Sequence, residues 1–386
     1  MQRLFSGGAE SAPPAGNRQQ AVKQNFILVA GISQLFDAKG QQLFLSYSPV
    51  SRAIHELWHS QPVQAAGLTA GEFAAACLGN AAPPRLAAAL GQRLAQDPNP
   101  PVAGEAPADE GDWMQDPRCA VLRGEIGDHL ERFTQLTTQI TELKDIDNAR
   151  GAGHVPPPVD GTGATARLLE NAAWLAEMLL DYLRTQPITQ GADGPLGAEL
   201  TTLLAYEREQ HDLQAAHMTI LASHTWMGFF AACVLQKVIS QYWAIDLPFS
   251  EVKIISGLTD NPDMASTVMI SLAGAILDCL RGAQDGSPVQ WNNVFIMTSG
   301  YKSVIPCMTI YALLYGVEMV YTFERSEKIQ SLHPRYNLQD PQARRFWEKT
   351  WKGMQSQGWT DNDVSPYLRI ALQGRLENVR KTYSIS

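Results

Sequence analysis

The fold is decided by residues 294–327, which read VFIMTSGYKSVIPCMTIYALLYGVEMVYTFERSE. Two short apolar runs, 294–297 and 317–323, flank an apolar segment of helix length, 304–314. A short apolar run bounded by turn residues is typical of a strand buried on both faces. Two such strands joined by a helix form a parallel βαβ unit. The loop after the first strand, 298–302, is therefore expected at the sheet edge where ligands bind.

This loop reads Thr-Ser-Gly-Tyr-Lys and carries groups suited to an anion. Gly300 allows a tight turn and close approach of the backbone to a ligand, while the following helix offers unpaired N–H groups and the positive end of its dipole. Lys302 adds a full positive charge at the same place. The alternative is that Lys302 is a solvated surface lysine, and the tetrapeptide SGYK alone does not decide between the two.

The same order of strand, small or hydroxyl-bearing loop, and helix occurs three times in the chain. The other two strands are predicted at 26–30 (FILVA) and 217–222 (HMTILA), and the second is followed by a strongly helical segment, 229–239. Because parallel strands share one carboxyl edge, we expect all three loops to meet there. Ser33 has a compatible alternative role as the N-cap of the next helix. The loop residues are Gly31, Ile32, Ser33 and Gln34 after the first strand, and Ser223, His224, Thr225 and Gly228 after the second.

The rest of the chain predicts a helical insertion and two terminal segments. Amphipathic spacing indicates helices at 120–146, 167–183 and 198–213, and an Ala-rich helical pattern covers 61–94. A further strand is predicted at 252–255, giving at least five. We predict a flexible arm at 1–23, a Rossmann-type parallel sheet flanked by helices at 24–334 with an insertion at about 97–200, and a small helical segment at 335–386. Within the helical pattern, Thr69 and Glu72 have the spacing of a capping box.

The composition favours a soluble globular protein that does not bind long duplex DNA. The 386 residues are 45% hydrophobic with a net charge of −9, which is typical of a soluble globular chain and argues against binding long duplex DNA. A local positive pocket for a small anion remains compatible with this charge. The sequence has no signal peptide and no uninterrupted apolar run of membrane length, so we expect a cytoplasmic protein that is not in a membrane.

The cysteines and histidines do not show a complete set of metal ligands in the sequence. The five cysteines are scattered singly, as expected of buried reduced thiols. His55 and His59 are four apart on an expected helix, but spacing identifies no further ligand, and we interpret them as structural. The segment 335–386 interleaves tryptophans with basic residues, which suits stacking on nucleic acid or, as we favour, packing onto a neighbouring surface.

Taken together, these motifs resemble the CRISPR-associated Rossmann-fold (CARF) family, whose members sense cyclic oligoadenylates made by type III CRISPR complexes. The resemblance rests on the Gly31-Ile32-Ser33 turn, the Ser-x-Thr-x-x-Gly element from Ser223, and the 298–302 loop, which leads to a strand ending in Glu324. The family commonly has Thr-Gly-Gly-Tyr/Phe-Lys at the third motif. This chain differs by Ser299 in place of a glycine, by Ile32 in place of a small hydroxyl residue, and by long insertions.

The resemblance implies a homodimer that binds a cyclic tetra- or hexa-adenylate across its two-fold axis, with cyclic tetra-adenylate favoured. Effector members add a ribonuclease with an Arg-x-x-x-x-His motif, and none of the eight histidines here has an arginine five positions before it. A core without that domain resembles the ring nucleases, which cleave the messenger without metal or cofactor. The resemblance assigns catalysis to Lys302 and Ser33 and ligand binding to Gly31, Ile32, Gln34, Ser223, His224, Thr225, Gly228, Thr298, Ser299, Gly300 and Tyr301.

The main alternative function is a sensor. Such a protein would bind the ring without cleaving it and would control a partner protein or a promoter. His224 is an alternative general base because of its loop position and near-neutral pKa, although Lys302 is preferred. An unrelated dinucleotide enzyme is disfavoured, because the chain lacks the GxGxxG turn and the acidic residue that contacts the ribose.

Overall fold

The central sheet has six strands in the order β3-β2-β1-β4-β5-β6. Strands β1 to β5 are parallel, and β6 pairs antiparallel with β5. The computed structural model describes residues 23–31, 38–79, 82–97, 113–150, 163–185, 196–209, 213, 216–255, 258, 265–280, 291–298, 304–322 and 328–333, with single residues at 349, 352 and 356. The strands are β1 (Lys23–Val29), β2 (His217–Ser223), β3 (Val252–Ile255), β4 (Trp291–Ile296), β5 (Glu318–Thr322) and β6 (Ile329–Leu332).

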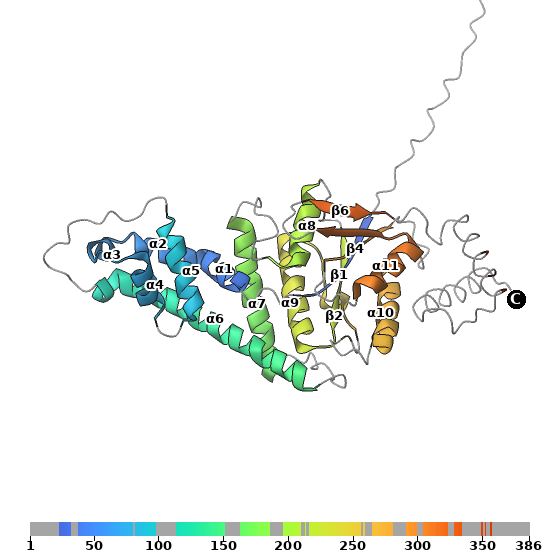
Figure 1. Cartoon of the computed structure of the whole chain (residues 1–386), viewed down its shortest axis with the longest axis horizontal. Helices are drawn as coiled ribbons and strands as arrows, with labels where there is room; N and C mark the ends of the chain where they lie inside the picture. The colour runs from blue at the N-terminus through green and yellow to red at the C-terminus, as the bar shows by residue number, and fades with distance from the viewer. Residues whose placement is uncertain are drawn as a thin grey trace, which may run out of the picture.

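The sheet is covered by helices on both faces (Figure 1). Alternate side chains of β1 divide between the two sides: Phe26 and Leu28 pack with α7, α8 and α9, whereas Ile27 and Val29 pack with α10 and α11. All four side chains are fully buried. This is why the central strand is an unbroken apolar run rather than an alternating one. The bounds are α7 (Gly163–Thr185), α8 (Ala198–Arg208), α9 (Trp226–Tyr242), α10 (Ala265–Cys279) and α11 (Val304–Tyr315).

The connection from β1 to β2 is a long helical insertion that contains α1 to α8. It is helical from Ala38 onward, well before residue 97. The 34-residue helix α6 runs from the cluster of short helices toward the sheet, and contacts α2 and α4 at one end and α9 at the other (Figure 1). The remaining bounds are α1 (Ala38–Ser46), α2 (Ser48–Trp58), α3 (Gln61–Ala65), α4 (Ala70–Leu78), α5 (Pro84–Ala95) and α6 (Pro117–Arg150).

These elements confirm the predicted α/β fold with a parallel sheet. The capping box at the start of α4 is also confirmed, since Thr69 and Glu72 each accept a hydrogen bond from the other's backbone N–H. Helix α8 is shorter than the predicted 198–213 and ends at Arg208. Residues 1–22 of the arm predicted at 1–23 lie outside the described residues, as does almost all of the 335–386 segment. Lys23 does not belong to an arm, because it is the first residue of β1. Among the helices described, none is both long and apolar enough to span a membrane.

Candidate functional site

The loops after β1, β2 and β4 begin at one edge of the sheet. Parallel pairing sets Val29 beside Leu221, and Leu28 beside Ile296, so the three strands end at nearly the same level. The strand order reverses between β1 and β4, because β2 and β3 lie on one side of β1 and β4 to β6 on the other. Such a reversal marks the crevice at which open α/β sheets bind ligands.

The structure places part of each predicted loop at this edge. Gly31 follows β1, and Thr298 follows β4. Ser223 is the last residue of β2 rather than a loop residue, His224 and Thr225 follow it, and Gly228 lies in the first turn of α9. The remaining predicted site residues lie outside the described residues, so their ligand contacts and catalytic roles stay predictions. They are Ile32, Ser33 and Gln34 of the first loop and Ser299, Gly300, Tyr301 and Lys302 of the third.

The first half of α8 lies against this edge of the sheet, a placement that sequence reasoning missed. Thr202 Oγ1 lies 3.1 Å from Thr298 Oγ1 after β4 and 2.9 Å from Thr322 Oγ1 at the end of β5. A Cβ atom at Gly197, the N-cap of α8, would lie 3.7 Å from the carbonyl oxygen of Gly31. The last helix of the insertion therefore contacts the ends of β4 and β5 through Thr202, and its N-cap lies near Gly31 after β1.

Helix α8 brings a buried acid to this position. Glu199 is 2% exposed, and its Oε2 would lie 3.3 Å from a Cβ at Gly197. Burial raises the pKa of this carboxyl from 4.5 to about 8, because the charged form loses its hydration. At neutral pH the group is mostly protonated and uncharged. A buried acid with a raised pKa beside a crevice is a feature that functional sites share.

The raised pKa predicts that Glu199 costs stability as the pH rises. Between about pH 4.5 and pH 8 the folded chain holds a proton here that the unfolded chain releases, so the free energy of unfolding falls across that window. Glu199→Gln removes this cost. We expect urea unfolding to show the variant gaining roughly 3 kcal/mol over wild type on going from pH 5 to pH 8. Glu209→Gln, at the exposed C-cap of the same helix, should show no such gain; equal behaviour of the two variants would contradict the raised pKa.

The hydroxyl groups of the β2 loop are engaged in local structure. Thr225 Oγ1 accepts a hydrogen bond from the Gly228 N–H at 2.9 Å and so caps α9. The same oxygen lies 2.8 Å from the buried Oγ of Ser223. Gly228 is needed because a Cβ there would lie 2.0 Å from Ser223 Oγ. The Ser-x-Thr-x-x-Gly spacing thus has a local explanation as a strand-to-helix turn, and its predicted contact with a ligand remains untested.

An acidic side chain occupies the N-terminus of α9, a position that also suits a phosphate. The carboxylate of Asp147, near the end of α6, accepts hydrogen bonds from the Trp226 N–H at 2.9 Å and the Met227 N–H at 3.1 Å. The positive end of a helix dipole favours such a negative group. The contact joins residues about 80 positions apart, so local sequence patterns gave no signal for it.

Comparison with known proteins adds one finding. A family model described as CRISPR-associated protein (Cas_APE2256) matches residues 195–334. The match supports a CRISPR-associated protein. It runs from the start of α8 through β6, and so includes the loops after β2 and β4 but not β1 or the Gly31 turn. None of the curated proteins matches the chain.

Proposed function

We propose that this CRISPR-associated chain binds cyclic tetra-adenylate at the carboxyl edge of the sheet and cleaves it. The observation that carries the proposal is that β1, β2 and β4 end at one edge of the sheet beside the strand reversal. The ends of β2 and β4 fall within the CRISPR-associated match. A ring of phosphates needs backbone N–H donors and a few cations rather than a basic face. A net charge of −9 is compatible with that kind of site.

The proposed reaction is an internal displacement within the RNA ring. The ribose 2′-oxygen gives up its proton and attacks the adjacent 3′-phosphorus, the bond to the 5′-oxygen breaks, and that oxygen takes a proton. The products are a 2′,3′-cyclic phosphate and a 5′-hydroxyl. The protein contributes by holding the ribose in line and by neutralising charge on the transition state. Lys302 supplies the neutralising charge, and Ser33 orients the hydroxyl or the phosphate.

A homodimer fits the symmetry of the ligand. Cyclic tetra-adenylate is two-fold symmetric, and an isologous dimer presents two identical crevices across its axis. Each crevice then holds half of the ring. Backbone donors near Gly300 and Gly31 and the hydroxyl of Thr298 hold phosphates and riboses.

The test is incubation of the purified full chain with labelled cyclic tetra-adenylate and cyclic hexa-adenylate. Linear products ending in a 2′,3′-cyclic phosphate, detected by mass spectrometry within minutes, support the enzyme. Saturable binding that leaves the ring intact would show that the chain is a sensor and not an enzyme. If neither ring is bound at micromolar concentrations, both functions fail.

One observation favours the sensor as the second candidate. Asp147 ties the end of α6 to the start of α9, and the other end of α6 contacts the short helices of the insertion. A phosphate that took the same two N–H groups would displace the carboxylate and release that end of α6. Ligand binding would then be transmitted along a 34-residue helix to a distant surface.

This competition predicts the effect of removing the carboxylate. Asp147→Ala frees the Trp226 and Met227 N–H groups and removes a negative charge beside them. We expect about tenfold tighter binding of cyclic tetra-adenylate, measured by equilibrium titration at fixed salt. Asp145→Ala makes the same charge change at an exposed position of α6 and is the control. Equal affinities for the two variants would show that the ligand does not use the α9 N-terminus.

A further inference from the structure

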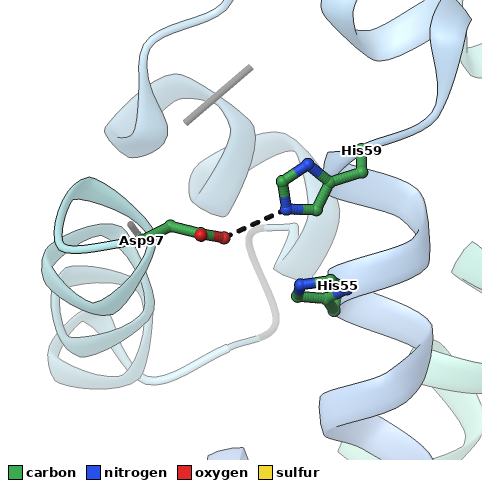
Figure 2. Close-up of side chains that lie close together, drawn as sticks. All are labelled: His55, His59 and Asp97. Atoms are coloured by element: carbon green, nitrogen blue, oxygen red, sulfur yellow. Dashed lines mark hydrogen bonds and ion pairs between the residues drawn. The ribbon is translucent and has the colours of Figure 1, made fainter. Parts of the chain in front are cut away.

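Two histidines project together from the end of α2. His55 lies in its last turn and His59 is its C-cap, and the His59 N–H donates to the His55 carbonyl oxygen at 3.1 Å, so the helical turn continues through both. A spacing of four puts both side chains on one face. Their ring centroids are 4.4 Å apart (Figure 2). Residues 55–59 read HELWH, the H-E-x-x-H pattern in which two histidines on a helix bind zinc.

A third potential ligand, Asp97, approaches this face from the segment just after α5. Asp97 follows α5, and its Oδ2 lies 3.0 Å from His59 Nε2 (Figure 2). The contact is partly buried, with the His59 side chain 25% and the Asp97 side chain 12% exposed. One ligand atom from each of His55, His59 and Asp97 lies within 4.8 Å of the other two. Among the described residues this is the only such group of three or more. The spacing of the histidines alone did not identify Asp97, because 38 residues separate it from His59.

The geometry points to a site for a divalent transition metal, best suited to Zn²⁺, formed by His55, His59 and Asp97. Bonds of about 2.0–2.1 Å to nitrogen and oxygen place neighbouring ligand atoms of a tetrahedral ion about 3.3 Å apart. The 3.0 Å separation of the His59 and Asp97 atoms is close to that edge. His55 is exposed, so its ring is free to adjust toward the ion. Three protein ligands leave the fourth position open to water, as in catalytic rather than closed structural zinc sites.

The simpler alternative is a hydrogen bond between His59 and Asp97 that only ties α2 to α5. Two variants separate these roles. His55→Ala removes a metal ligand but leaves the hydrogen bond between His59 and Asp97 in place. Because residue 55 is exposed, the fold should tolerate the loss of this side chain. Asp97→Asn keeps an amide oxygen for hydrogen bonding to His59 while removing the charged ligand.

The experiment is calorimetric titration of the chelator-treated full chain with Zn²⁺. We expect one ion per chain. In a separate thermal melt, Zn²⁺ at a hundredfold excess over the dissociation constant should raise the melting temperature by roughly 3 °C. His55→Ala and Asp97→Asn should each weaken binding by at least about tenfold. His333→Ala, at an exposed histidine beyond β6, should leave it unchanged. The site is overturned if wild type shows no saturable binding at one ion per chain, or if both ligand variants bind like wild type.

Discussion

Replacing Lys302 by alanine is expected to slow the opening of cyclic tetra-adenylate by at least about a hundredfold. The ammonium group is proposed to stabilise charge that develops only in the transition state, so binding of the intact ring should weaken much less than turnover. Single-turnover assays with labelled ring, together with equilibrium binding on the same variant, separate the two quantities.

The matched control for this experiment is Lys23→Ala. It removes the same charge at the first residue of β1, which lies at the amino edge of the sheet and therefore opposite the crevice. The control should cleave like wild type. Unaltered turnover in Lys302→Ala would remove the catalytic assignment, and equal losses in both variants would indicate a general charge effect.

Gly228→Ala is expected to be the most damaging single substitution for the fold. The added Cβ would lie 2.0 Å from Ser223 Oγ, 2.8 Å from the Ser223 carbonyl oxygen and 2.9 Å from its nitrogen. A side chain can rotate away, but the backbone of β2, which is paired on both sides, cannot move without disturbing its pairing with β1 and β3. We expect a loss of about 3 kcal/mol or more in the free energy of unfolding, measured by urea denaturation.

Gly274→Ala provides the comparison. Gly274 lies in α10, is exposed, and has no atom within 4 Å of the position that its Cβ would take. In the interior of a helix this change should stabilise the chain by about 0.5–1 kcal/mol. If Gly228→Ala is as stable as Gly274→Ala, α9 does not pack against β2 as closely as in this structure.

Gly228 also shows that one sequence pattern can have two causes, and its contact with a ligand stays a prediction. The pattern of strand, small loop and helix predicted a glycine that lets a ligand approach closely. The structure gives this glycine a local partner, Ser223, which crowds the first turn of α9. A short strand-to-helix turn needs small residues whether or not a ligand binds there, so the pattern alone does not separate the two causes.

The sequence predicted elements that carry their own local signal. The apolar runs of β1, β2 and β4, the three-to-four spacing of α6, and the capping box of α4 are all visible in consecutive residues. Helix α1 was not predicted, and two further elements were missed because that signal is weak. Strand β6 (IQSL) buries only Ile329, and α10 (ASTVMISLAGAILDC) is apolar almost all round, without the polar face that marks a helix.

The features of the site that sequence reasoning missed are contacts between distant segments. Asp147 reaches α9 from the end of α6, and Glu199 reaches the crevice because α8 returns to the carboxyl ends of β1 and β4. Asp97 approaches the two histidines of α2 from the end of α5. Each pairing depends on how the insertion packs, which a pattern of neighbouring residues does not encode.

The most direct test of the central claim is a crystal structure of the Lys302→Ala variant with cyclic tetra-adenylate bound. We predict that the ring lies across a two-fold axis, with its phosphates contacting the loops that follow β1, β2 and β4, and with residue 302 on the same side as Ser33 and Thr225. A ring bound at the amino edge of the sheet or on the helical insertion would contradict the account. The same holds for residue 302 lying on the opposite side of the molecule from Ser33.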